Sequence, residues 1–317
     1  MIYYIGFSIG WEKIWTIIKN IKPWQLGVVL ILPLSWNMLH ALGWFFLVGE
    51  KKQFHFYHFL EAQISSTAVA EVVPLGQAGG EPYRAYYVKN RYSSNASPNI
   101  VASVILYNTV HTLVTGCLMV AGFLVLLSVI NVSVTKRWIF SIGLLLGFFA
   151  VLIFIQKQKT GFMEKIFSFL GKFKIFHKIV QKKQHKAVLV DERLKVFYQK
   201  NKKSFYGSLF IILVAKFLGA IEFYLILNFI DANISFSIAF LVFAANAFVQ
   251  LFLFFFPAQI GASEGSIYYL FKILGKDPLF GISLALFRRI RALLWTLIGL
   301  VLGYLRGPGK KMEQKDL

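Results

Sequence analysis

The chain has 317 residues, of which 57% are apolar and only 15% are charged, and its formal net charge is +20. A soluble domain carries about 25% charged residues, and a water-soluble fold of this size cannot hide so much apolar surface. The composition therefore excludes a soluble enzyme, a disordered protein and a disulfide-stabilised secreted domain, and it predicts an all-α polytopic membrane protein.

Apolar stretches long enough to cross a bilayer recur along the chain. A transmembrane helix needs about 20 predominantly apolar residues. Five stretches meet this requirement, and a sixth has the length but is interrupted by three arginines, so we expect five or six spanning helices. The six stretches are 24–48, 100–130, 138–155, 205–230, 236–256 and 279–305.

Two shorter segments are predicted to be re-entrant hairpins, which enter and leave the membrane by the same face. The first, 60–92, joins a short apolar helix to an aromatic one across Pro74 and a glycine-rich turn. The second, 236–275, includes the fifth apolar stretch as one arm and turns at Pro257. The basic segments of the chain are expected on the same side of the membrane. Counting the spans that connect them then requires the two hairpins to open toward opposite sides.

Most of the excess positive charge gathers in the stretch 157–203, which holds thirteen lysines and one arginine against three acids. Cytoplasmic loops of membrane proteins carry an excess of Lys and Arg, so this loop and the basic C-terminus are predicted to be cytoplasmic and the N-terminus outside. Flanked by apolar segments, the loop is expected to touch an anionic lipid surface, and no nucleic acid is expected as a partner. Helical spacing near its end, at Ala187, Val190, Leu194 and Phe197, predicts a helix along the inner surface.

The two predicted hairpins repeat the same polar pattern. The first reads Pro74-Leu-Gly-Gln-Ala-Gly-Gly-Glu81 and the second reads Pro257-Ala-Gln-Ile-Gly-Ala-Ser-Glu264. Opposite orientation together with repeated sequence predicts an inverted repeat, the architecture of many transporters. We expect a single membrane domain, 1–317, in which repeat one spans about 24–130 and repeat two about 205–306.

The break in each hairpin is predicted to bind the polar part of a substrate. Irregular backbone at membrane depth is tolerated only where it is buried in protein or lines a wet cavity. Each glutamate is expected to begin the helix after the break, where the helix N-terminus favours an anion, and the planar fork of Arg84 suits a phosphate or a carboxylate. The alternative is that Pro74 and Pro257 are structural kinks, but the recurrence of proline, glycine and glutamate favours a functional site.

Other charges inside apolar stretches are expected to face the same cavity. Arg288 and Arg291 share a face of the last helix, whereas Arg289 is expected to point elsewhere, toward the interface. His40, His111 and the amides of Asn108, Asn246 and Gln250 are expected to make interhelical hydrogen bonds, and the role of Glu71 stays undecided. The predicted substrate-binding residues are Gly76, Gln77, Gly79, Gly80, Glu81, Arg84, Gly261, Glu264, Arg288 and Arg291, with Pro74 and Pro257 as hairpin breaks and Glu222 and Glu264 as proton carriers.

The sequence contains no nucleophile elbow, no nucleotide-binding loop and no metal-ligand spacing of histidines and acids. We therefore expect no catalytic residue, no metal and no cofactor. The absence of an ATPase motif predicts transport that is downhill or coupled to protons.

At these residues the chain resembles the lysylphosphatidylglycerol synthase transmembrane-region family, also called flippase-like membrane proteins. The resemblance rests on Pro74-x-Gly-Gln-x-Gly-Gly-Glu-x-x-Arg84, on Pro257-x-x-x-Gly-x-x-Glu264 and on Arg288-x-x-Arg291-x-x-x-Trp295, and it covers about residues 11–306. Members fused to a synthase domain are associated with moving an aminoacylated lipid between leaflets. Stand-alone members, which this chain resembles, are linked to other lipids, including hopanoids and lipid-linked sugars. No synthase domain and no extra N-terminal span are expected here, so the lysyl-lipid substrate is not carried over.

These observations together predict a lipid translocase of a bacterial-type inner membrane, which moves a lipid with a polar, phosphate-bearing headgroup between leaflets. Three alternatives stay open: an ion-coupled carrier for a small organic acid, a membrane-embedded transferase, and a non-transporting accessory subunit in envelope lipid modification. A carrier for soluble solutes predicts a cavity closed to lipid, whereas a transferase predicts product formation in detergent. The expected partners are membrane lipids, and a homo-oligomer is possible.

Overall fold

The computed structural model describes residues 22–49, 51–73, 76–92, 96–129, 174–230, 232–252 and 261–307, together with scattered residues between 138 and 169. Within these ranges the regular structure is helical and no strand occurs, which confirms the all-α prediction. Most of the predicted span 138–155 lies outside the described residues, as do Pro74, Pro257 and the N-terminal 21 residues.

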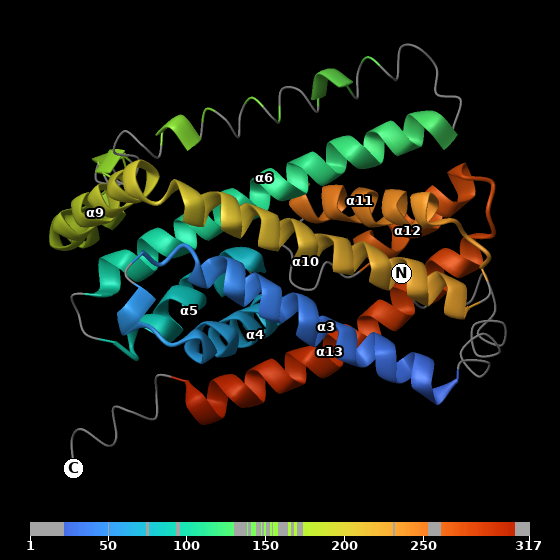
Figure 1. Ribbon diagram of the computed structural model, residues 1–317, viewed down its shortest axis with the longest axis horizontal. Helices are drawn as coiled ribbons and strands as arrows, with labels where there is room; N and C mark the ends of the chain where they lie inside the picture. The colour runs from blue at the N-terminus through green and yellow to red at the C-terminus, as the bar shows by residue number, and fades with distance from the viewer. Residues whose placement is uncertain are drawn as a thin grey trace.

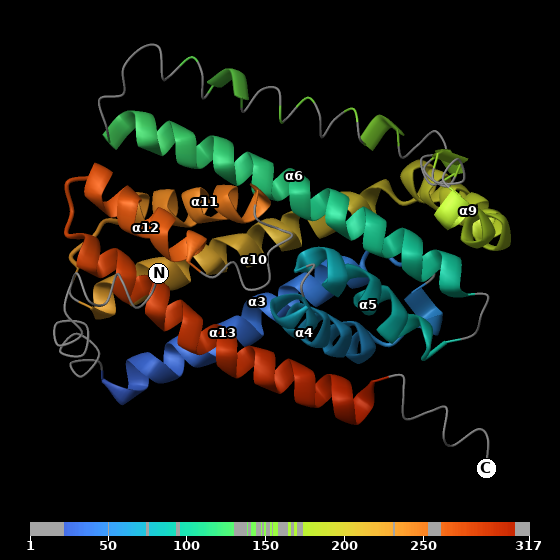
Figure 2. The same ribbon diagram turned by 180° about the vertical axis from the view of Figure 1, so that it is seen from behind.

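Among the described residues, three helices are long and apolar enough to cross a membrane: α3 (Pro23–Phe45), α6 (Ser97–Val129) and α10 (Lys202–Phe229). Helix α13 (Pro278–Arg306), with 29 residues, corresponds to the stretch interrupted by arginines. These four helices run along the molecule, as Figure 1 and, from behind, Figure 2 show. The prediction of a polytopic membrane protein is confirmed.

Two pairs of shorter helices occupy the positions of the predicted hairpins. Helix α4 (Phe56–Val72) packs on α5 (Gln77–Lys89), and α11 (Phe236–Phe252) packs on α12 (Ala262–Ile273). The two pairs lie toward opposite ends of the long axis in Figure 1 and Figure 2. Helix α13 packs against α12 of one pair and α4 of the other. That each pair enters and leaves the membrane by one face stays a prediction.

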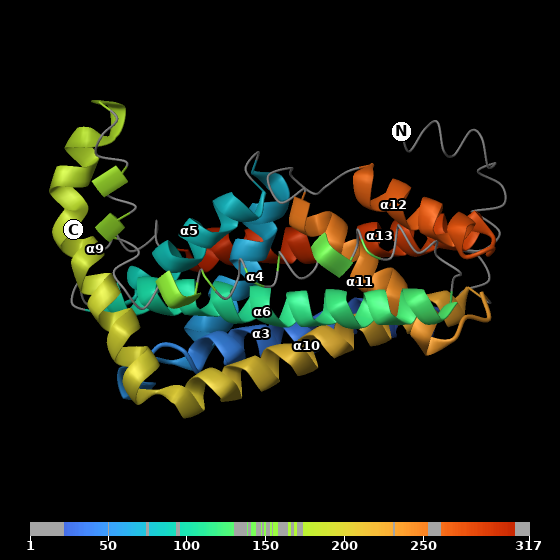
Figure 3. The same ribbon diagram turned by 90° about the horizontal axis from the view of Figure 1, so that it is seen from above.

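The basic stretch contains a long helix near its end, as its spacing predicts. This helix, α9 (Lys174–Lys200), buries Ala187, Val190, Leu194 and Phe197 and packs against α6. Figure 3 shows α9 projecting away from one end of the long helices. A contact of its basic residues with lipid headgroups stays a prediction.

Helix α4 lies in close contact with a helix on each side because small residues bring the backbones together. A Cβ atom at Gly80 of α5 would lie 2.6 Å from the carbonyl oxygen of Ser66, and a Cβ at Gly299 of α13 would lie 2.6 Å from that of Ile64. Small residues at helix crossings are the usual means of close packing between membrane helices. The positions of α5 and α13 against α4 are therefore fixed by backbone contact.

This close approach makes Gly80 sensitive to the addition of a single methyl group. We expect Gly80→Ala to lower the free energy of unfolding by roughly 1–3 kcal/mol through overpacking, although alanine normally stabilises a helix interior relative to glycine. Gly116→Ala on α6 is the matched control, since no heavy atom lies within 4 Å of a Cβ at that position. Thermal unfolding in detergent compares the two variants, and equal midpoints would contradict the close approach.

A cluster of polar side chains fastens the C-terminal end of α13 to the first helix pair. The carboxylate of Glu61, whose residue is 7% exposed, accepts hydrogen bonds from Arg306 Nη1 at 2.7 Å, from the Tyr87 hydroxyl at 3.1 Å and from Arg91 Nη2 at 3.3 Å. Arg91 also donates to the backbone carbonyl of Arg306. We call these four residues the Glu61 clamp; no pattern in the sequence predicts this role of Glu61.

Candidate functional site

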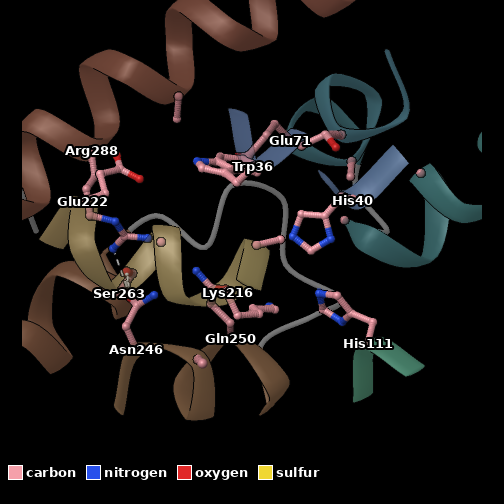
Figure 4. A pocket seen from close by; sticks show the side chains of 18 of the residues that line it. Trp36, His40, Glu71, His111, Lys216, Glu222, Asn246, Gln250, Ser263 and Arg288 are labelled. Atoms are coloured by element: carbon pink, nitrogen blue, oxygen red, sulfur yellow. Dashed lines mark hydrogen bonds between the residues drawn. The ribbon is translucent and has the colours of Figure 1, made fainter. Parts of the chain in front are cut away.

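A cavity of about 330 Å³ lies at the centre of the helices and is shown in Figure 4. All four long helices and all four helices of the two pairs contribute side chains to its wall. Its volume falls at the lower end of the range of about 300–1,000 Å³ that ligand pockets occupy. The fold therefore places one polar chamber where the two halves of the chain meet.

Most of the predicted site residues line this cavity. Gly79 and Gly261 are not among the described lining residues, and the side chain of Gln77 lies outside the described part of the chain. A binding role for any of them stays a prediction. The predicted residues that line the cavity are Gly76, Gly80, Glu81, Arg84, Glu222, Glu264, Arg288 and Arg291.

Glu264 lies in the first turn of helix α12, as the repeat predicts. Gly261 is the N-cap residue with φ +87°, and its backbone N–H donates to Oε2 of Glu264 over 2.8 Å. The other carboxylate oxygen, Oε1, accepts a hydrogen bond from Nη2 of Arg289. The carboxylate is thus held both by the start of its own helix and by α13.

Glu81 does not occupy the equivalent place, so the prediction that it begins its helix is wrong. Helix α5 starts at Gln77 after Gly76, which has φ +52°, and no acid stands in its first turn. The N-cap glycine precedes Glu81 by five residues but precedes Glu264 by three. Oε2 of Glu81 accepts from the amide of Asn108, and Oε1 lies 3.8 Å from Nη1 of Arg84. Glu81 therefore faces a neighbouring helix and has only a loose ion pair.

The arginines of α13 have separate partners. Nη1 of Arg291 lies 2.5 Å from both carboxylate oxygens of Glu222, whose side chain is 2% exposed. Arg289 pairs with Glu264, so the expectation that it points toward the interface is wrong. The physical reason is that α12 packs against α13 and presents a carboxylate to Arg289.

Arg288 has no carboxylate within 4 Å among the residues that the structure describes. Its Nη1 donates to Oδ1 of Asn246 over 3.2 Å, and the same oxygen accepts from the Ser263 hydroxyl over 2.7 Å. The guanidinium carbon lies 4.5 Å from the centre of the Phe223 ring. Nε is buried and has no hydrogen-bond partner among the described residues. Arg288 is thus oriented by polar groups but keeps a donor free.

Arg84 approaches the cavity from the first helix pair and is 7% exposed. Its Nε donates to the hydroxyl of Ser66 over 3.1 Å, and its guanidinium carbon lies 4.7 Å from the centre of the Tyr107 ring and 5.6 Å from that of Trp44. Nη1 is buried and makes no hydrogen bond within the described residues. The aromatic rings and Ser66 hold the guanidinium in one orientation.

Several lining residues were not predicted to belong to the site. Lys216 of α10 was overlooked, although a lysine within an apolar stretch is costly enough to be a signal. Glu71, left undecided, also lines the cavity, as do His40 and His111. The Tyr107 hydroxyl and Nδ1 of His40 are 2.9 Å apart, so the expected interhelical hydrogen bond exists as well.

The described lining of the cavity contains nine charged residues, although the surrounding helices are largely apolar. A single charge at the bilayer centre costs about 2.5–3.5 kcal/mol on insertion scales, so this density is typical of a site that handles a polar group. The cationic residues outnumber the acidic ones by five to four. They are Arg84, Lys216, Arg288, Arg289 and Arg291, against Glu71, Glu81, Glu222 and Glu264.

The chain matches the model of a protein family over most of its length. The model of the family described as the lysylphosphatidylglycerol synthase TM region matches residues 1–299, which include both helix pairs and every residue that lines the cavity. Comparisons with curated proteins and with solved structures give no match.

Proposed function

Because the chain belongs to the lysylphosphatidylglycerol synthase transmembrane-region family, we propose that it is a lipid translocase, which moves a lipid with a polar headgroup between the two leaflets. Membership supports a membrane protein with a role connected to lipids. The finer assignment rests on the charged cavity at the centre of the apolar helices.

The size of the cavity supports this proposal. At about 30 Å³ for each water molecule, a volume of about 330 Å³ holds on the order of ten waters, which suits a hydrated headgroup but not two acyl chains. The acyl chains would stay in the lipid while the headgroup crosses through the cavity. The headgroup would replace water as the partner of the charged lining residues.

The two helix pairs supply the elements that would move. Glu81 and Arg84 belong to the first pair, and Glu264 belongs to the second. Rearrangement of one pair against the long helices would open the cavity to one leaflet, and rearrangement of the other pair would open it to the opposite leaflet. With a bacterial-type inner membrane as the location, the basic loop 157–203 and the C-terminus would face the cytoplasm.

Leaflet exchange in proteoliposomes tests the proposal. Headgroup-labelled anionic, zwitterionic and lysyl-modified lipids are exposed to a quencher that cannot cross the membrane. We expect the wild-type protein to accelerate exchange of at least one headgroup class over empty liposomes. A panel on which it accelerates none would overturn the translocase proposal for those lipids, and product formation in detergent would then favour a transferase.

Arg84→Gln is expected to reduce the exchange rate at least tenfold. The substitution removes the guanidinium that Tyr107 and Ser66 hold at the cavity wall, while glutamine keeps a polar side chain of smaller reach. Lys89→Gln is the matched control, because Lys89 lies on the same helix and is not among the lining residues. Equal exchange rates for the two variants would mean that Arg84 has no role in lipid exchange.

A further inference from the structure

We propose that Arg288 and Lys216 form the anion site of this cavity and that the anion they bind is a phosphodiester group. The assignment rests on the proposed function, which it deepens by naming the site and the class of headgroup. It differs from the expectation based on sequence, which gave the role to Arg84, Arg288 and Arg291 and did not include Lys216.

The ion pairs leave these two cations available. Arg289 and Arg291 each hold a carboxylate at hydrogen-bond distance, and Arg84 has Glu81 at 3.8 Å. Arg288 and Lys216 have no carboxylate within 4 Å in the part of the chain that the structure describes. Both line the cavity, so an anion that enters meets two cations that hold no carboxylate at this distance among the described residues.

Arg288 is oriented for an incoming acceptor. Asn246 and Ser263, which are 4% and 8% exposed, form a short chain of hydrogen bonds that ends on Nη1 of Arg288. Nε is buried and finds no acceptor in the part of the chain that the structure describes, and a buried donor without an acceptor is unfavourable. A guanidinium presents its N–H groups in a planar fork that matches two oxygens of a phosphate. A phosphate oxygen would therefore supply the acceptor that the protein does not.

Lys216 reaches the cavity from α10. In the view of Figure 4 its side chain lies between the group formed by Arg288, Asn246 and Ser263 and the pair formed by His40 and His111. The ammonium is a compact charge on a flexible stem, and it binds phosphate without a fixed geometry. Lys216 would follow a bound phosphate as it moves through the cavity, whereas Arg288 would fix it at one position.

The charge of the cavity favours a diester over a monoester. With all groups ionised, the five cations and four carboxylates among the described lining residues leave one positive charge. A phosphodiester carries one negative charge, which neutralises this excess. A phosphomonoester carries about 1.5 to 2 negative charges at pH 7, which is more than the excess positive charge. A lipid whose headgroup is joined through a phosphodiester is thus the class that the lining matches.

Binding to the purified full chain in detergent tests the assignment separately from transport. The probes are phosphatidylglycerol as a lipid diester, phosphatidic acid as a lipid monoester, diacylglycerol as a neutral lipid and glycerophosphoglycerol as a soluble diester. The variants are Lys216→Met, Lys216→Arg and Arg288→Gln. Lys203→Met is the matched control, because Lys203 lies on the same helix, is exposed and is not a lining residue.

We expect wild type to bind phosphatidylglycerol at least tenfold more tightly than phosphatidic acid or diacylglycerol. Lys216→Met and Arg288→Gln each weaken that binding at least tenfold, Lys216→Arg restores it to within threefold of wild type, and Lys203→Met leaves it unchanged. Unfolding midpoints within a few degrees of wild type show that weakened binding is not caused by misfolding. If glycerophosphoglycerol binds as tightly as phosphatidylglycerol, the anion site is supported, but its ligand is a soluble diester and not a lipid.

Unchanged phosphatidylglycerol binding in Lys216→Met would overturn the proposed site, as would a preference for phosphatidic acid or for diacylglycerol. These outcomes leave lipid exchange by the wild-type protein as a separate result, so the translocase proposal would stand without this site. If binding depends on Lys216 and Arg288 but the protein accelerates no lipid exchange, the anion site is supported and the translocase proposal is refuted.

Discussion

Glu222→Gln is expected to lower the free energy of unfolding by about 3–5 kcal/mol, which is the usual penalty for removing one partner of a buried ion pair. Both carboxylate oxygens of Glu222 lie 2.5 Å from Nη1 of Arg291, and the two side chains are 2% and 14% exposed. The glutamine leaves a buried guanidinium without its counter-charge between α10 and α13.

The double variant Glu222→Gln with Arg291→Met shows whether the loss comes from the unpaired charge. A buried ion pair replaced by groups without charge is often close to neutral, so the double variant should regain most of the lost stability. Denaturant titration of all four proteins in mixed micelles gives the coupling free energy. Losses that simply add would mean that Glu222 and Arg291 stabilise the protein independently, against the geometry of the pair.

Glu264→Gln and Glu81→Gln are expected to behave differently although the two glutamates are equivalent in the repeat. The substitution at Glu264 replaces a charged acceptor of the Arg289 guanidinium and of the Gly261 N–H group. Hydrogen bonds to charged groups contribute about 1.5–3 kcal/mol each, so we expect a loss of roughly 2–4 kcal/mol and at least a tenfold fall in exchange. In Glu81→Gln the amide oxygen of the new glutamine can still accept a hydrogen bond from Asn108. The substitution also removes the loose ion pair with Arg84, and such a pair contributes at most about 1 kcal/mol to stability.

Measurement of both variants by the same denaturant titration and the same exchange assay decides the point. A stability loss at Glu264 that exceeds the loss at Glu81 by more than about 1 kcal/mol is a difference of at least about fivefold in the folding equilibrium. Equal effects on both properties would restore the symmetric arrangement that the repeat predicts and would refute the asymmetry of the two helix starts.

The helices were predictable because the membrane imposes a simple rule on the sequence. An apolar stretch of about 20 residues reports a spanning helix by length alone, and α3, α6 and α10 follow the predicted stretches closely. The shorter pairs were recognisable from the interruption of apolar runs by glycine-rich segments. The contact of α13 with both pairs was not predictable, since it depends on the fit of Gly299 against α4 rather than on any local pattern.

The site was predictable as a set of charges but not as a set of pairs. Repeated glutamates and intramembrane arginines carry a visible energetic signal, and most of the predicted residues line one cavity. The residue at which a helix starts after a run of small residues was not predictable, because more than one glycine in the run can adopt the required backbone conformation. For this reason the offset between Gly76 and Gly261, and with it the different position of Glu81, appears only in the structure. The pairing of Arg289 likewise depends on where α12 packs.

Helix α13 carries a consequence for the timing of any transport cycle. Arg289 fastens it to α12, and Arg306, seventeen residues and about 26 Å further along the axis, fastens it to the Glu61 clamp of the first pair. Because a continuous helix transmits a tilt or a slide from one end to the other, the two pairs cannot rearrange independently while both attachments hold. Affinity for a ligand at one pair is then reciprocally linked to the state of the other. In the proposed transport cycle this linkage would make the opening of one pair depend on the state of the other, and a state open to both sides at once would require one of the two attachments to break.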